Sequence, residues 1–255
     1  MFDIPGELIA QFRTAQRVAV LTGAGISAES GVPTFRDAQT GLWARYRAGK
    51  EHRAEDLATP EAFQRDPRLV WEWYAWRREM MAKAEPNPGH RALVEMEQCV
   101  PVFTLITQNV DGLHQQAGSG KRFPVIELHG NIQRTKCFSE NKLVESWKKD
   151  GEAPPRCPYC GGYLRPDVVW FGEALPEEAL QSAWEAARNC EVFFSIGTSG
   201  LVEPAASLPY LARQAGACLV DINPKPTPIS GVAIHFLQYP SGQILPALVQ
   251  AIWIE

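Results

Sequence analysis

The chain has 255 residues, of which 45% are hydrophobic and 21% charged, and its formal net charge is −4. This composition is typical of a globular protein with a sizeable core, built as one large domain with an insertion or as two domains. The small negative charge argues against direct binding to nucleic acid or to a membrane surface. No apolar stretch is long enough to span a bilayer, and the first residues lack a signal-peptide pattern. We therefore expect a cytoplasmic, monomeric protein.

The predicted elements alternate between helix and strand along most of the chain. In chain order they are a helix over 7–16, a strand over 17–21, helices over 67–84 and 89–98, and strands over 102–107, 124–128, 192–196, 218–222 and 233–236. Such alternation favours an α/β fold with a parallel, doubly wound sheet. Residues 133–165 interrupt the pattern with polar residues, three cysteines and a Pro-Pro pair, which predicts an inserted small module.

Three of the predicted strands end in polar or glycine-rich segments. The first leads into Thr22-Gly23-Ala24-Gly25-Ile26-Ser27, the next into Gln108-Asn109-Val110-Asp111, and the third into His129-Gly130. Ligands of open parallel sheets bind beyond the carboxyl ends of the strands. The three segments therefore predict one shared site. His129 is its candidate general base, because histidine exchanges protons near neutral pH.

Residues 23–28 fit the G-x-G-x-x-A fingerprint of dinucleotide-binding turns. Glycine there lets the backbone approach a pyrophosphate at a helix N-terminus. By itself the fingerprint also fits a glycine-rich turn with no ligand. A dehydrogenase would carry an acidic residue at the end of a second strand about 20 residues later. Residues 41–46 do not form a strand pattern, so a NAD site here is not predicted to serve hydride transfer.

The cysteines of the inserted module have the spacing of a zinc site. Cys157-Pro158-Tyr159-Cys160 forms a C-x-x-C pair, whereas Cys137 has Glu140 in place of a second cysteine. Four cysteines in this arrangement would hold structural zinc, and a carboxylate oxygen can also ligate zinc. The sequence therefore leaves two readings open. Either Cys137, Cys157, Cys160 and Glu140 or water hold zinc, or the metal has been lost and the three cysteines remain.

Together these segments resemble the sirtuins, the NAD-dependent protein-lysine deacylases, in their bacterial and archaeal type. The resemblance covers nearly the whole chain in order and spacing, and it is carried by residues 23–27, Pro33-Thr34-Phe35-Arg36, residues 107–114, His129-Gly130, Leu164-Arg165-Pro166, residues 168–173 and Gly197-Thr198-Ser199. It implies a Rossmann-type NAD-binding domain over 1–36, 86–132 and 166–255. A helical segment over 37–85 and a zinc-ribbon-like module over 133–165 complete the expected division.

The resemblance also implies roles for individual residues. The NAD contacts it implies are Gly23, Ala24, Gly25, Ser27, Thr34, Phe35, Arg36, Gln108, Asn109, Asp111, Gly197, Thr198, Ser199 and Asn223, with the amides of residues 23–25 on the pyrophosphate. The peptide substrate would pair by β-augmentation with a stretch that contains Val168, Trp170, Phe171 and Gly172. His129, Asn109 and Asp111 would be catalytic, and the products would be lysine, nicotinamide and O-acyl-ADP-ribose.

One pair in the helix over 67–84 indicates the acyl class. Tyr74 and Arg77 lie three residues apart and so share a helix face, which we expect to differ from the apolar stripe of Trp73, Trp76 and Met80. On an ordinary amphipathic helix they would be a solvated pair. Within the family, Tyr-x-x-Arg here resembles the signature of desuccinylases and demalonylases, since arginine offers a fixed fork to a carboxylate. Arg78 is one residue out of register and should point elsewhere.

Three function classes compete on this evidence. The first is a deacylase that prefers succinyl- and malonyl-lysine and also acts on acetyl-lysine. The alternative is a mono-ADP-ribosyltransferase that uses the same NAD site, and the third is a non-catalytic NAD-binding module. Asn109, Asp111 and His129 favour the deacylase.

Overall fold

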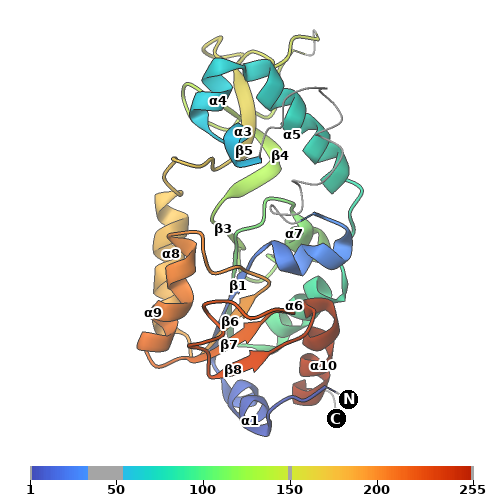
Figure 1. Cartoon of the computed structure of the whole chain (residues 1–255), viewed down its shortest axis with the longest axis vertical. Helices are drawn as coiled ribbons and strands as arrows, with labels where there is room; N and C mark the ends of the chain where they lie inside the picture. Colours follow the sequence, from blue (N-terminus) through green and yellow to red (C-terminus); the bar gives the residue numbers. More distant parts are fainter. Residues whose placement is uncertain (1, 34–53, 149–150, 254–255) are drawn as a thin grey trace.

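The computed structural model describes residues 2–33, 54–148 and 151–253 (Figure 1). Its helices are α1 (Gly6–Thr14), the 3₁₀ helix η1 (Ala24–Ser30), α3 (Ala54–Leu57), α4 (Pro60–Arg65), α5 (Pro67–Met81), α6 (Pro88–Cys99), α7 (Leu113–Ala117), α8 (Glu177–Asn189), the 3₁₀ helix η3 (Ala205–Ser207), α9 (Leu208–Gln214) and α10 (Ser241–Trp253). Its strands are β1 (Arg17–Thr22), β2 (Val102–Thr107), β3 (Ile126–Glu127), β4 (Gly130–Cys137), β5 (Leu164–Val168), β6 (Val192–Ile196), β7 (Cys218–Ile222) and β8 (His235–Leu237). None of the described helices is long and apolar enough to cross a membrane.

The larger of the two described sheets confirms the predicted α/β architecture. It has six parallel strands in the order β3-β2-β1-β6-β7-β8. From β1 the chain builds outward to β2 and β3, and later continues on the other side of β1 with β6, β7 and β8. The order therefore reverses between β1 and β6, and the loops after these two strands lead away from a common point. Ligands of doubly wound sheets bind at such a switch point.

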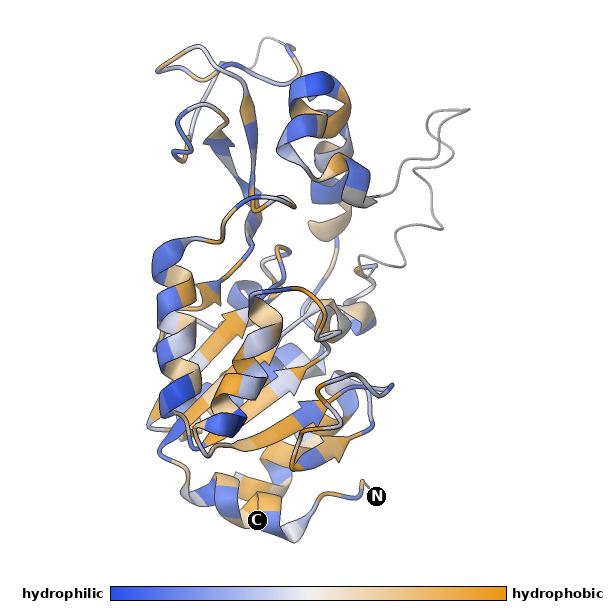
Figure 2. Cartoon of the chain, turned by 60° about the vertical axis from the view of Figure 1, so that its left-hand side comes forward, coloured by the Kyte–Doolittle hydropathy of each residue, from blue (hydrophilic) through white to orange (hydrophobic). Residues whose placement is uncertain are grey.

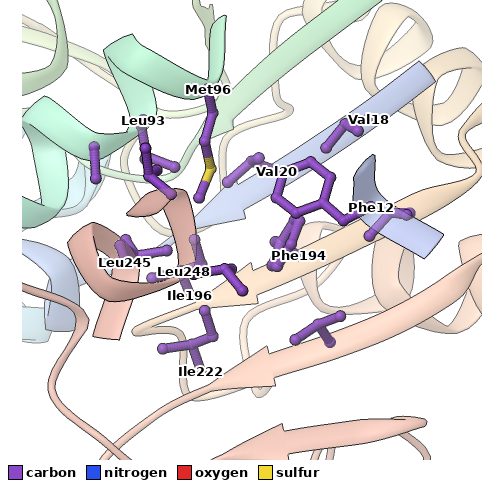
Figure 3. Packing of buried hydrophobic residues seen from close by; sticks show 14 of the residues in the cluster. Phe12, Val18, Val20, Leu93, Met96, Phe194, Ile196, Ile222, Leu245 and Leu248 are labelled. Carbon is purple, nitrogen blue, oxygen red and sulfur yellow. The ribbon is translucent and has the colours of Figure 1, made fainter. Parts of the chain in front are cut away.

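Alternation along the strands places one hydrophobic cluster on each face of this sheet. Val18 and Val20 pack with α1, α6 and α10 on one face, and Figure 3 shows Val20 and Phe194 of the strands beside Phe12 and Met96 of the helices. Ala19 and Leu21 face the other way, into a cluster with α8 and α9. The strands are accordingly among the most hydrophobic segments of the molecule (Figure 2). They hold the loops at their carboxyl ends on a rigid support.

The second sheet and the helices α3, α4 and α5 form a separate region at the other end of the molecule (Figure 1). β4 and β5 pair antiparallel, and a cluster of apolar side chains joins them to α3, α4 and α5. Asp66 caps α5 by accepting the N–H of Leu69, and Pro67 stands at its first turn. The sequence predicted α5, but it predicted no strand for residues 130–137 or 164–168. These two strands carry charged side chains and lack a clear alternation.

Candidate functional site

The loops that follow β1 and β6 touch backbone to backbone where the strand order reverses. A Cβ atom added to Gly23 would lie 2.7 Å from the Cα of Thr198, and one added to Gly25 would lie 2.7 Å from the Cα of Gly197. Gly197 has a φ of +61°, and a Cβ there would lie 2.5 Å from the backbone nitrogen of Ile26. Only glycine fits such positions. The glycines of the fingerprint therefore bring two strand ends together at the ligand-binding edge.

Two backbone amides of the fingerprint are used in this contact. The N–H of Gly23 donates to the carbonyl of Ile196 at 2.9 Å, and the N–H of Gly25 donates to the carbonyl of Gly197 at 2.8 Å. The sequence predicted that both amides would face a pyrophosphate, whereas in the structure they donate to carbonyls at the end of β6 and directly after it. Among these three residues, the pyrophosphate prediction now rests on Ala24.

A buried polar network joins the ends of β1 and β2. The side-chain amide of Asn109 donates to the carbonyl of Gly23 at 3.1 Å and to the Ser27 hydroxyl at 3.2 Å. That hydroxyl donates to Asp111 at 2.8 Å, and the other carboxylate oxygen of Asp111 accepts the N–H of Leu113 at 2.9 Å. Burial raises the pKa of the Asp111 carboxyl, while these hydrogen bonds act in the opposite direction. The three predicted side chains therefore meet in one fixed arrangement.

A second set of contacts links the ends of β2, β6 and β7. Gln108 donates from Nε2 to the Thr198 hydroxyl at 3.0 Å. The Asn223 amide donates to the carbonyl of Thr198 at 3.1 Å. Thr198 and Asn223 are buried, whereas Ser199 is partly exposed beside them. Residues predicted to contact the same dinucleotide thus lie together along one sheet edge.

His129 is oriented by a hydrogen bond to the backbone. Its Nδ1 lies 2.9 Å from the carbonyl oxygen of Gln108. A carbonyl can only accept, so Nδ1 carries the proton and Nε2 carries the free lone pair of the neutral ring. Burial lowers the pKa of His129, and the bond to Gln108 opposes this. The imidazole is therefore held in the tautomer that a general base needs.

Tyr74 and Arg77 lie next to each other, as their spacing predicts. The Cζ of Arg77 lies 5.6 Å from the centre of the Tyr74 ring and 5.0 Å from that of Trp73. Burial lowers the pKa of Arg77, while the neighbouring Tyr74 and, to a smaller extent, the charge of Asp111 oppose this shift. The two side chains therefore form one pair on α5.

One expectation about this helix is wrong. Tyr74 does not lie apart from the predicted apolar stripe, because it is 3% exposed and belongs to the same buried cluster as Trp73, with ring centres 4.5 Å apart. Residues 73 and 74 are about 100° apart on the helix, and the β4–β5 region covers a face wide enough to bury both. The prediction for Arg78 is confirmed, since it donates to the carbonyls of Ile132 and Arg134 in β4.

The stretch predicted to pair with a peptide is largely held by the protein itself. The N–H groups of Val169, Trp170 and Phe171 donate to the His129 carbonyl, the Glu173 carboxylate and the Ala58 carbonyl, respectively. Val168 pairs with Gly130 of β4, and Gly172 has a φ of +86°. The side chain of Phe171 is 45% exposed, whereas that of Trp170 is only 2% exposed. Phe171 thus offers an apolar surface, and Trp170 points into the protein.

Three of the predicted metal ligands come together. The sulfur atoms of Cys137, Cys157 and Cys160 all lie within 4.8 Å of one another, and those of Cys137 and Cys160 are 3.4 Å apart. Tetrahedral zinc with bonds of about 2.3 Å to sulfur sets its ligand atoms about 3.8 Å apart. The three thiols therefore fit zinc in both type and spacing.

The two turns that carry these cysteines have the same backbone hydrogen bonds. The N–H of Cys157 donates to Gly162 and its carbonyl accepts from Gly161, while Cys137 makes the same two bonds with Lys142 and Asn141. Gly161 and Asn141 both have positive φ values, of 74° and 53°. Glu140 occupies in the first turn the place that Cys160 has in the second. Its side chain is exposed and is not part of the cysteine group, so the fourth ligand stays a prediction.

Some residues fall outside these observations or were given no role by the sequence. Thr34, Phe35 and Arg36 lie outside the described residues. His90 lies 3.4 Å from the Ser27 hydroxyl, and Arg165 binds Glu173 through both of its terminal nitrogens. The sequence assigned no role to His90, Arg165 or Glu173.

Comparisons with known proteins agree with this geometry. Residues 23–204 match the model of the Sir2 family. The NAD-dependent protein deacylase of Aquifex aeolicus is 54% identical over 86% of this chain and 88% of its own, and that of Pyrococcus furiosus is 50% identical over 97% of both. A Sir2 homologue solved as a NAD complex has a TM-score of 0.88 at 42% identity, covering 98% of this chain and 94% of its own.

Proposed function

Because the chain belongs to the Sir2 family and is an NAD-dependent protein deacylase, we propose that it prefers lysines that carry succinyl or malonyl groups. Acetyl-lysine is a poorer substrate. The observation that carries this proposal is the Tyr74–Arg77 pair, packed beside the Trp73 ring. It supplies a positive charge and a hydroxyl group within a cluster of mostly apolar side chains.

The preference follows from the cost of removing charge from water. An acidic acyl chain that enters an apolar tunnel loses its hydration, which is costly unless a partner charge replaces it. Arg77 can replace that hydration with a charge-assisted hydrogen bond, worth about 1.5–3 kcal/mol. An acetyl group brings no carboxylate, so the guanidinium gains nothing from it. The pair therefore discriminates by the distal end of the acyl group.

The sheet edge performs the step that all acyl groups share. NAD, as cosubstrate, supplies an electrophilic ribose carbon that accepts the acyl oxygen when nicotinamide leaves. Asn109 and Asp111 would hold the nicotinamide end, because their amide and carboxylate supply both donors and acceptors. His129 would take a ribose hydroxyl proton at Nε2 while Gln108 holds Nδ1. One water molecule is taken up as the lysine amine leaves, so the products would be free lysine, nicotinamide and the O-acyl ester of ADP-ribose.

The role proposed for zinc is structural. Cys137, Cys157 and Cys160 would hold it at the joined turns of the small region, with Glu140 or water as the fourth ligand. A zinc ion there would fix β4 relative to β5, because each turn is attached to one of these strands.

A substrate panel tests the proposal. Peptides of one sequence that carry succinyl-, malonyl- or acetyl-lysine are compared by kcat/KM, with nicotinamide release also measured without any acyl peptide. We expect the two acidic acyl groups to exceed acetyl by at least about tenfold, which is about 1.4 kcal/mol. Equal values for the three peptides would refute the acyl preference. Nicotinamide release coupled to ADP-ribosylation of protein would instead indicate the transferase activity.

A further inference from the structure

A hydrogen bond between two buried aromatic residues connects the peptide-pairing stretch to the acyl-recognition pair. The indole N–H of Trp170 donates to the hydroxyl oxygen of Tyr74 at 3.0 Å, and the two side chains are 2% and 3% exposed. Their rings are stacked with centres 6.2 Å apart. Position 170 thus reaches the acyl-recognition pair through its side chain, not through its backbone.

The Trp170 ring is held tightly in place. The guanidinium carbon of Arg165 lies 3.2 Å from the ring centre, and both terminal nitrogens of Arg165 bind the Glu173 carboxylate. Glu173 also accepts the backbone N–H of Trp170 at 2.8 Å. Phe63 packs against the same ring, with centres 5.3 Å apart. The direction of the indole N–H is therefore fixed before any substrate binds.

Among the described residues, the hydrogen bonds around Tyr74 leave its phenol proton without an acceptor. An indole N–H can only donate, and so can the guanidinium of Arg77, which lies beside the same hydroxyl. The Tyr74 oxygen must therefore accept from these neighbours, and its own O–H has to point elsewhere. Within residues 2–33, 54–148 and 151–253, no group accepts a hydrogen bond from it. A buried O–H without an acceptor is costly, so an incoming acceptor gains from it.

We propose that Trp170 is a positioning residue for acyl specificity. By occupying the Tyr74 oxygen as an acceptor, it commits the phenol proton to the distal carboxylate of the acyl group. Arg77 and Tyr74 then act as two donors aimed at the same carboxylate. This inference rests on the proposed preference for acidic acyl groups and adds the residue that orients one of its two donors.

The test is the ratio of kcat/KM on succinyl-lysine to kcat/KM on acetyl-lysine, measured for three variants. Trp170→Phe keeps an aromatic ring against Phe63 and removes the N–H donor together with one ring of the indole. The resulting loss of packing should affect both peptides equally, so only the ratio reports the donor. Tyr74→Phe removes the hydroxyl, and the third variant combines both changes. We expect Trp170→Phe to lower the ratio about 3- to 10-fold, as for one oriented neutral hydrogen bond. In the double variant the Trp170 change should add little, because its target is gone.

The ratio separates this role from a merely structural one. A loss of activity that is equal on both peptides would indicate a disturbed peptide stretch and would overturn the proposal. Full additivity of the two changes would overturn it as well. Arg77→Met serves as the reference: if it lowers the ratio and Trp170→Phe does not, only this inference fails. If Arg77→Met leaves the ratio unchanged, the proposed acyl preference itself is wrong.

Discussion

The six-stranded sheet and the β4–β5 region differ in how their functional polar groups find partners. At the sheet edge, Ser27, Asn109 and Asp111 bind one another, and Gln108 orients His129. In the β4–β5 region, the Tyr74 proton has no acceptor within the described part of the chain, and three thiols gather beside a turn that lacks a fourth. The edge is therefore assembled in advance for a cosubstrate that every reaction uses. In the β4–β5 region, the acyl group and the zinc ion that we propose would supply the missing partners.

The largest expected effect comes from removing the base at the sheet edge. His129→Ala should lower deacylation about 10²- to 10⁴-fold on every acyl peptide, because proton transfer is common to all of them. NAD binding should remain, since His129 is held by Gln108 and not by the Asn109–Asp111 network. Single-turnover kinetics and calorimetric titration with NAD measure the two effects. Activity within a few-fold of the parent would show that His129 is not the base.

The second prediction removes the proposed recognition of the acyl carboxylate and leaves the residues at the sheet edge unchanged. Arg77→Met should lower kcat/KM on succinyl-lysine about 10- to 100-fold through loss of a charge-assisted hydrogen bond. The value for acetyl-lysine should change far less. Arg78→Met is a matched control, because Arg78 donates to β4 carbonyls and should affect stability without changing the preference. Similar losses for both variants on both peptides would assign Arg77 a structural role.

The third prediction concerns the turn after Cys137, which carries Glu140 where the matching turn carries Cys160. Glu140→Cys places a thiol at the position equivalent to Cys160, and softer thiolate binds zinc better than carboxylate or water. Zinc affinity against a chelator should rise by about tenfold, or 1.4 kcal/mol. Cys157→Ser should lower the bound zinc measured by elemental analysis. If the parent protein is folded and contains no zinc after mild dialysis, the module does not retain the metal.

The smallest expected effect is on the free energy of unfolding at acidic pH and concerns two histidines that pack beside the six-stranded sheet. Burial lowers the pKa of His90 to about 4 and that of His114 to about 3. The unfolded chain takes up these protons first, so the stability they contribute is complete above pH about 6.5 and is lost as the pH falls toward 4 and 3. Each can add up to about 1.4 kcal/mol per pH unit to the slope. Urea unfolding between pH 7 and 4 should be less pH-dependent in His114→Gln, and an unchanged slope would contradict this assignment.

The sheet could be predicted from the sequence because its signals are local. Val18, Val20 and Phe194 lie in short apolar runs that predict strands. The segments that follow parallel strands meet at one edge of the sheet, regardless of the conformation of the connecting loops. The same reasoning brought Asn109, Asp111 and His129 together. The domain boundaries at 36, 85, 132 and 165, the cytoplasmic location and the monomeric state stay predictions. The structure shows only that β4 starts before residue 133 and that β5 ends after residue 165.

Tertiary structure decided what depends on contacts between distant segments. The sequence placed Tyr74 beside Arg77 through helical spacing, but the Trp170 indole reaches Tyr74 from 96 residues away and no local pattern encodes that hydrogen bond. The spacing of the cysteines predicted a zinc site, while the matching turns around Cys137 and Cys157 needed the backbone itself. The fingerprint located Gly23 and Gly25, yet only the packing against Gly197 showed that their amides serve the neighbouring loop. Periodicity and motif spacing are short-range properties, whereas the direction of a donor is set by whatever the fold brings next to it.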